Sequence, residues 1–116
     1  MNPESSLKRN SDFRRVYARG KSAASPRVVV YCRKNRLGVN RTGFTVSKKL
    51  GHAVVRNRVR RRLREIVRLN SPQFRQGYDL IVVARTRAVD AEYLKLEADL
   101  LHCCEQLQLL KKDSAV

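Results

Sequence analysis

The most regular pattern of apolar and polar positions lies in the stretch HAVVRNRVRRRLREIVR, residues 52–68. At 100° per residue the apolar side chains gather on one side of a helix, and most of the arginines lie on the other. The pattern predicts an amphipathic helix that begins near His52 or Ala53 and ends near Leu69, before Asn70, Ser71 and Pro72. The predicted apolar stripe consists of Val55, Val59, Leu63, Ile66, Val67 and Leu69.

The polar side of this helix predicts a ladder of guanidinium groups. Its central members are Asn57, Arg60, Arg61, Arg64 and Arg68, while Arg56, Arg58 and Arg62 flank or overlap the apolar side. The stems of the flanking arginines would have to extend outward to water. Glu65 is placed to pair with Arg61 or Arg62, which would neutralise little of the ladder.

Three further stretches have the pattern of strands. Residues 27–33 alternate between two faces, one formed by Val28, Val30 and Cys32 and the other by Val29, Tyr31 and Arg33. Residues 41–49 predict a second strand, and the short link 35–40 predicts that the two form an antiparallel pair. Residues 78–85 are apolar throughout, as in a central strand buried on both faces. Residues 22–25 leave room for a very short extra strand.

Two more helices frame these strands. Asn10 or Ser11 is expected to cap the first, which ends at Gly20 and places Phe13, Val16 and Tyr17 on one face. Asp90 is expected to cap the last. Its core-facing stripe is Leu96, Leu100, Cys103, Leu107 and Leu110.

The predicted fold is a small two-layer α/β sandwich of the α+β class, in the order α-β-β-(β)-α-β-α. The chain of 116 residues is expected to form a single domain over residues 9–111, with flexible tails at 1–8 and 112–116.

Charge identifies the class of partner. The chain has 26 Lys and Arg against 10 Asp and Glu, a formal charge of +16, and all but three of the basic residues precede residue 90. A net charge this positive indicates that the partner is a polyanion. A membrane partner is not expected, because no apolar run approaches the roughly 20 residues that span a bilayer. With no signal-peptide pattern and three cysteines without metal-binding spacing, the chain is expected to be cytoplasmic, with free thiols.

Aromatic residues bear on which polyanion binds. Phe13, Tyr17 and Tyr31 can form a stacking platform beside a basic groove, as in proteins that bind single strands. The spacing of Phe13 suits a core residue at least as well, and Tyr17 and Tyr31 are open to either role. Nothing resembles a helix-turn-helix or a zipper. RNA or single-stranded nucleic acid is therefore favoured.

Metal-dependent hydrolysis by the chain itself is not expected. Metal-activated water needs two or three convergent carboxylates, and the acids of residues 1–89 form no obvious pair. His52 and His102 lie far apart in the sequence. We therefore expect no catalytic residue and no metal or cofactor held by the protein.

The stretch KLGHAVVRNRVRRRLRE, with the preceding GFTVSKK, resembles the signature of the protein subunit of bacterial ribonuclease P. Residues 51–64 match the family pattern G-x-A-V-x-R-N-R-x-(K/R)-R-x-x-R at every fixed position, and SDFRRVYARG, VVVYC and GYDLIVVAR resemble further family elements. The resemblance implies a fold like domain 2 of ribosomal protein S5, with a left-handed crossover around the arginine helix. Such a crossover could not be expected otherwise, because about 98% of crossovers are right-handed.

The resemblance also implies a function. The chain would bind a catalytic RNA and the 5′ leader of precursor tRNA, and would assist Mg²⁺-dependent cleavage performed by the RNA, which holds most of the metal. No small-molecule substrate is implied. The implied RNA-binding residues are Phe13, Tyr17 and Tyr31 in the leader cleft, Ser47, Lys48 and Lys49 in the basic turn, and Arg56, Asn57, Arg58, Arg60, Arg61, Arg64 and Arg68 on the helix. Two alternatives are a general nucleic-acid-binding module without a catalytic partner and a metal-dependent protein nuclease.

Overall fold

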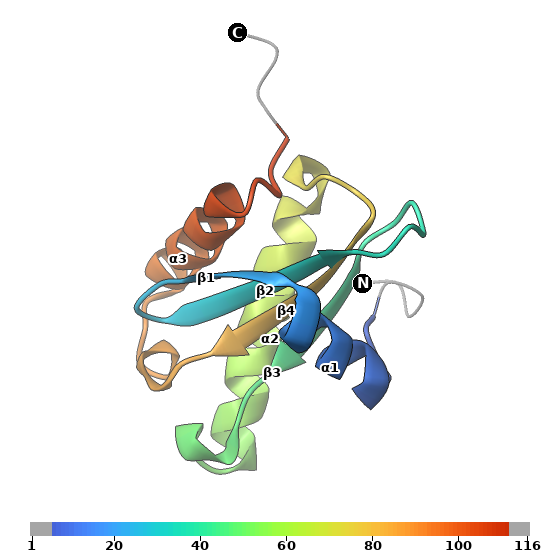
Figure 1. The fold of residues 1–116 in the computed structure, drawn as a ribbon. Coiled ribbons are helices and arrows are strands. Elements are labelled where there is room, and N and C mark those ends of the chain that lie inside the picture. The colour runs from blue at the N-terminus through green and yellow to red at the C-terminus, as the bar shows by residue number, and fades with distance from the viewer. Residues whose placement is uncertain (1–5, 112–116) are drawn as a thin grey trace, which may run out of the picture.

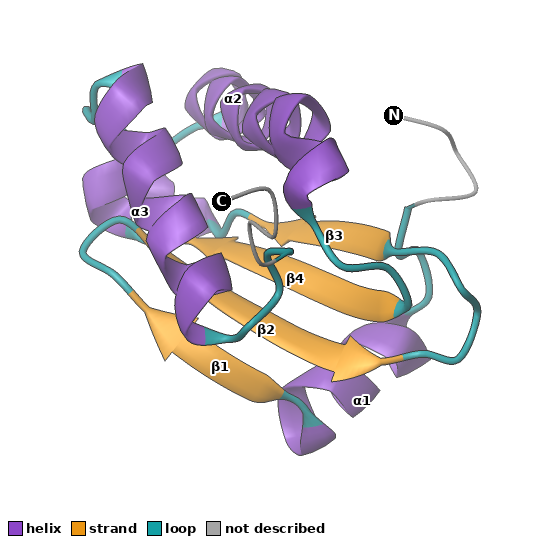
Figure 2. Ribbon diagram, turned by 90° about the horizontal axis from the view of Figure 1, so that it is seen from above, coloured by secondary structure: helices purple, strands orange, loops and turns teal. Residues whose placement is uncertain are grey.

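The computed structural model describes residues 6–111, which form a four-stranded sheet covered by helices on both faces (Figure 1). One helix, α1, lies on one face, and α2 and α3 lie side by side on the other (Figure 2). The order of elements confirms the prediction, and the short extra strand is present. The elements are α1 (Asn10–Arg19), β1 (Lys21–Ala24), β2 (Val28–Lys34), β3 (Arg41–Thr45), α2 (Ala53–Asn70), β4 (Tyr78–Ala84) and α3 (Tyr93–Gln106).

The sheet has the strand order β1-β2-β4-β3, which corrects one prediction. β2 and β3 were expected to pair directly, but β4 lies between them, antiparallel to β2 and parallel to β3. The link 35–40 is long enough to cross the roughly 10 Å that this arrangement requires. β4 takes the central place because its residues are apolar toward both faces. α2 forms the crossover between the parallel strands, and the left hand of this crossover remains a prediction.

Two apolar cores lie on the two faces of the sheet. The larger one lies under α2 and α3 and includes Val28, Val30 and Cys32, as the alternation of β2 predicted. The smaller one lies under α1 and consists of Leu7, Val16 and Ile81. The sheet is therefore fully covered on one face and only partly covered on the other.

Both outer helices begin at residues other than the predicted caps. The N-cap of α1 is Arg9 rather than Asn10 or Ser11, and that of α3 is Glu92 rather than Asp90. Neither cap residue makes a side-chain capping bond, so the packing of the apolar faces outweighs capping here. α3 ends at Gln106, and therefore Leu107 and Leu110 pack against the core from beyond the helix.

The packed domain extends to residues that were assigned to the N-terminal tail. Leu7 is 5% exposed, and its N–H donates to the carbonyl oxygen of Thr42 at 3.0 Å. The rest of the predicted tails, residues 1–5 and 112–116, lies outside the described residues. No helix between residues 6 and 111 is long and apolar enough to cross a membrane.

Candidate nucleic-acid interface

The arginine helix α2 presents the predicted side to solvent. Val59, Leu63, Ile66 and Val67 are buried, and Leu63 and Ile66 have no exposed surface. The solvent side carries Asn57, Arg58, Arg61, Arg64 and Arg68, which are all exposed. Leu69 is 53% exposed, so its assignment to the apolar stripe was wrong. It lies about 100° from the centre of the buried sector, too far round the helix to reach the core.

The flanking arginines differ from one another. The guanidinium of Arg62 lies over the ring of Tyr93 on α3, 5.8 Å from its centroid, a cation–π contact that holds the stem against the protein. Arg56 is half-buried, and its Nε has no hydrogen-bond partner among the described residues. Arg60, which was predicted to be a central member of the ladder, is half-buried as well and donates to Oδ1 of Asn57 at 3.0 Å, whereas Arg58, predicted to flank the apolar side, is exposed. Arg60 and Arg62 are therefore each held by a side-chain contact.

Glu65 pairs with Arg68, not with Arg61 or Arg62 as predicted. Nε of Arg68 donates to Oε2 of Glu65 at 3.1 Å. The hydrogen bond from Arg68 lowers the pKa of Glu65, and the same bond raises the pKa of Arg68. Both side chains are about half exposed, so the pair adds little stability. Its consequence is that Arg68 is partly neutralised, whereas Arg61 and Arg64 have no acidic partner within residues 6–111.

The face of the sheet under α1 is only half covered. Ile81 is fully buried there, but Val29, Thr45 and Val83 beyond it are partly exposed. Tyr17 stands at the edge of α1, 39% exposed, and its hydroxyl lies 2.8 Å from Oγ1 of Thr45.

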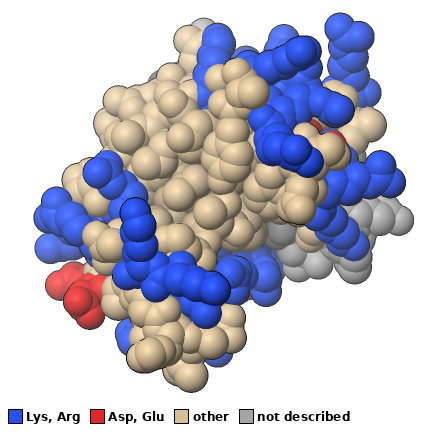
Figure 3. All heavy atoms as spheres, turned by 60° about the horizontal axis from the view of Figure 1, so that its bottom comes forward, with Lys and Arg blue, Asp and Glu red and all other residues tan. Residues whose placement is uncertain are grey.

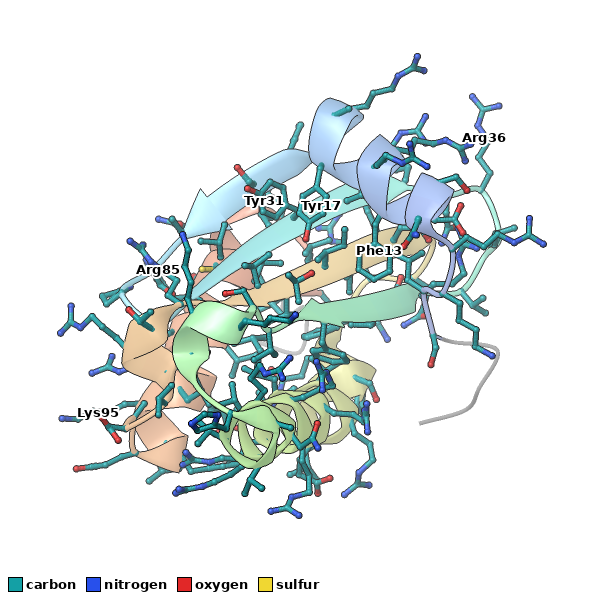
Figure 4. All side chains as sticks on the ribbon, turned by 90° about the horizontal axis from the view of Figure 1, so that it is seen from below. Phe13, Tyr17, Tyr31, Arg36, Arg85 and Lys95 are labelled. Carbon is teal, nitrogen blue, oxygen red and sulfur yellow. The ribbon has the colours of Figure 1, made fainter. Side chains whose placement is uncertain are left out.

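The aromatic residues that were predicted to form a platform lie together on this side of the sheet. The rings of Tyr17 and Tyr31 meet edge to face, with centroids 4.8 Å apart. Figure 4 shows Phe13, Tyr17 and Tyr31 in a row alongside α1, on the face of the sheet that carries this helix. Two phenol rings that are fixed in this way, on a partly exposed apolar floor, can stack against unpaired bases.

Phe13 joins the platform to the ladder. Its half-buried ring packs against the smaller core and lies on Gly43 of β3, where an added Cβ would come within 2.4 Å of its Cζ. Beside it is a hollow of about 160 Å³ that is also lined by Arg60 and Arg64 of α2. The aromatic surface and the ladder thus meet around the β3 edge. Gly43 was missed as a site residue, although glycine inside a strand is a known sign of close approach.

The basic turn Ser47–Lys49 connects β3 to α2. Its three residues are exposed, while Leu50 is buried and anchors the turn. In the space-filling view, Lys and Arg side chains gather around a central area that has few charged groups (Figure 3). Arg85, which follows β4, is exposed and donates to the carbonyl oxygen of Ser25 at 3.0 Å. Arg85 has no motif around it in the sequence that would predict a place in the interface.

No group of three or more His, Cys, Asp or Glu residues converges within residues 6–111. The two buried carboxylates, Asp12 and Asp79, both face Arg41, which donates to Asp79 at 2.7 and 2.9 Å. The hydrogen bond that Arg41 donates to Asp79 raises the pKa of Arg41. These carboxylates are neutralised by an arginine and tie α1 to β3 and β4. The donor set of residues 6–111 does not fit a metal ion held by three or more side chains of that part of the chain.

Comparison with known proteins agrees with this geometry. A family model described as Ribonuclease P matches residues 1–108. The ribonuclease P protein components of Alkaliphilus oremlandii and Natranaerobius thermophilus are each 46% identical to the chain, over 90% and 92% of it and 91% and 93% of their own lengths.

Solved structures have the same fold. The ribonuclease P protein of Staphylococcus aureus superposes with a TM-score of 0.85 at 35% identity, over 92% of this chain and 98% of that one. The protein from Thermotoga maritima has a TM-score of 0.78 at 31% identity, over 84% and 92%. The chain belongs to the family of ribonuclease P protein components.

Proposed function

We propose that the chain is the RNA-binding subunit of a ribonuclease P ribonucleoprotein, which removes the 5′ leader of precursor tRNA. The observation that carries the proposal is the exposure of Arg61 and Arg64 on the outer side of a helix whose inner side is buried. Guanidinium groups at helical spacing present planar forks that suit successive phosphates. Membership of the family supports RNA as the source of those phosphates.

The two parts of the interface have different roles in this proposal. The ladder and the basic turn contact folded RNA, either the catalytic subunit or the tRNA next to the cleavage site. The open sheet face, with Tyr17 and Tyr31, takes the unpaired leader, because stacking on aromatic rings tolerates any base. The hollow between Phe13 and Arg64 lies where a strand would pass from one part to the other.

The hydrolysis is assigned to the RNA subunit, with Mg²⁺ held mainly by that RNA. The support is the donor set of residues 6–111, whose buried carboxylates face Arg41 instead of converging on a free site. The residues of this chain then bind and orient the substrate, and they neutralise the repulsion between two polyanions.

Reconstitution tests the proposal. Purified protein and folded ribonuclease P RNA are assayed on precursor tRNA, separately and together, at low Mg²⁺. We expect cleavage by the combination, little by the RNA alone at that Mg²⁺ concentration, and none by the protein freed of RNA. Cleavage by the protein alone would refute the proposal. Equal binding of mature and precursor tRNA, without stimulation of the RNA, would indicate a general binding module instead.

A further inference from the structure

A second basic surface surrounds a hollow of about 400 Å³ near the β1 edge of the sheet, away from the β3 edge beside α2. The hollow is lined by the end of α1, the start of β1, the end of β2, the start of β4 and the turn after α3. Five cations line it: Arg19, Lys21, Arg33, Lys34 and Arg75. None of these belongs to the RNA-binding set that the sequence predicted.

Within residues 6–111, the charges of this hollow are not compensated by ion pairs. No carboxylate of residues 6–111 lies within ion-pair distance of any of the five. Arg33 and Arg75 are half-buried, and Nε of Arg75 is already engaged with the carbonyl oxygen of Leu110 at 3.3 Å. Arg19, Lys21 and Lys34 are exposed and hydrated, but a half-buried cation such as Arg33 loses part of its hydration at a cost when no counter-charge lies beside it. A bound anion removes that cost.

The hollow is a built feature of the fold. At Gly20, which joins α1 to β1, an added Cβ would lie 2.5 Å from the carbonyl oxygens of Val16 and Cys32. This close approach holds Arg19 and Lys21 beside β2. On the opposite wall Gln108 has a φ of 60°, in the left-handed region that few side chains adopt. Two tight backbone positions therefore define the walls.

The remaining lining indicates the kind of anion. Tyr78 and Leu107 are half-buried and give the hollow an aromatic and an aliphatic surface beside its cations. A volume of about 400 Å³ is within the usual range for small-molecule sites. We propose that this hollow is a nucleotide site, in which the cations bind phosphate and Tyr78 and Leu107 contact the base.

The nucleotide can come from two sources, a free nucleotide or one unit of a bound RNA strand. The second source rests on the proposed function, whereas the first does not. If RNA is the source, the protein contacts RNA near both edges of its sheet and links two segments of it. The phosphate chemistry is the same in both cases, so the two sources must be separated by experiment.

The first arm of the test uses the whole chain without RNA. ADP, adenosine and inorganic pyrophosphate are titrated while backbone amide signals are followed by NMR. We expect ADP to shift the amides of Gly20, Lys34 and Gln108 at lower concentration than adenosine does. The variant Arg19→Gln/Lys34→Gln should weaken ADP binding about ten-fold or more, since hydrogen bonds to charged groups are lost. The matched control is Arg87→Gln/Lys95→Gln, which removes the same two residue types from exposed positions outside the hollow.

The second arm measures the binding of precursor tRNA by the same two variants over a range of salt concentrations. Weaker RNA binding and a shallower salt dependence, for the hollow variant only, identify RNA as the source. A loss confined to ADP binding identifies a free nucleotide. The proposal is overturned if the two variants behave alike in both arms, or if ADP shifts only amides of α2 and the aromatic platform. Because the first arm contains no RNA, its outcome is independent of whether the chain serves ribonuclease P.

Discussion

At the scale of single residues, the position of Phe13 depends on the absence of a side chain at Gly43. An alanine Cβ there would lie 2.4 Å from Cζ of Phe13 and 2.8 Å from Cε1. The neighbouring β3 backbone is paired with β4 and cannot easily move. We expect Gly43→Ala to lower the free energy of unfolding by about 1–3 kcal/mol, as overpacking does, in urea titrations followed by circular dichroism.

A double mutant separates this steric effect from a general weakening of β3. Phe13→Leu removes the ring atoms that the new Cβ would meet, so Gly43→Ala should cost much less in the Phe13→Leu background than in the wild type. Equal costs in the two backgrounds would show that the glycine is needed for another reason. Gly43 and Phe13 also bear on RNA binding, because the ring of Phe13 borders the hollow that Arg60 and Arg64 line.

Cys104 gives the protein a predictable response to alkali. Burial raises the pKa of its thiol from 9.0 to about 12, so the folded state retains a proton that the unfolded chain releases near pH 9. The stability from this group is complete below pH 9 and is lost as the pH rises from 9 toward 12. Between pH 8 and 10 we expect a loss of about 1 kcal/mol that Cys104→Ala does not show, measured as free energies of unfolding. Equal pH dependence in both proteins would contradict this assignment.

Single-residue geometry was only partly predictable from the sequence. The two faces of β2 follow from strict alternation and were predicted correctly. The partner of Glu65 was not, because residues three or four positions away on either side are equally near on a helix, and side-chain packing selects among them. Arg68 lies three positions after Glu65 and makes the pair. A glycine inside a strand indicates a close approach, but no local pattern shows that the side chain approaching Gly43 is Phe13.

At the scale of elements, α2 has two sides that should respond differently to mutation. Leu63 has no exposed surface, and Leu63→Ala should lower the free energy of unfolding by about 2–5 kcal/mol through lost burial and the cavity left behind. The measurement is chemical unfolding of the RNA-free protein. A variant with unchanged stability would contradict the assignment of the buried side.

The opposite side of α2 should affect RNA and not stability. Arg64→Ala should leave the unfolding free energy nearly unchanged, because the residue is exposed. It should weaken RNA binding and reduce the slope of log K against log salt by roughly 0.7–0.9 per lost phosphate contact. Lys95→Ala, an exposed cation on α3, is the control. A slope equal to that of the control would remove Arg64 from the interface.

A helix or strand was predictable from the sequence where apolar residues recur at one regular spacing over many residues. α2 was placed to within a residue or two because its apolar spacing persists for four turns. The pairing of β2 with β3 was wrong because a six-residue link fits either adjacent strands or strands with one between them. The length of the link does not show whether a strand later in the sequence lies between the two strands that it connects. Strand order depended on β4, which has two apolar faces and occupies the centre.

At the scale of the whole molecule, the interface depends on how α1 and α2 are placed on opposite faces of one sheet. α2 provides the ladder and α1 borders the aromatic face, so neither helix alone provides both surfaces. They meet around the β3 edge, where residues from the N-terminal segment, α1, β3 and α2 line one hollow. The sequence predicted the members of both surfaces, but their continuity depends on β3 being the edge strand beside α2. The place of β3 at this edge follows from the order of the strands in the sheet, which local sequence patterns do not encode.

This arrangement leads to a prediction about substrate discrimination. Tyr17 lies on the open sheet face, apart from the ladder, and is 39% exposed. If the 5′ leader occupies that face, Tyr17→Leu should weaken binding of precursor tRNA by about 1–3 kcal/mol through the loss of one stacked base, and should leave mature tRNA unaffected. Arg64→Ala should weaken the binding of both. The measurement is the ratio of dissociation constants for precursor and mature tRNA at one fixed salt concentration, for the wild type and each variant. An unchanged ratio in Tyr17→Leu, with the domain still folded, would place the leader elsewhere on the protein and leave the ladder as the sole supported RNA contact.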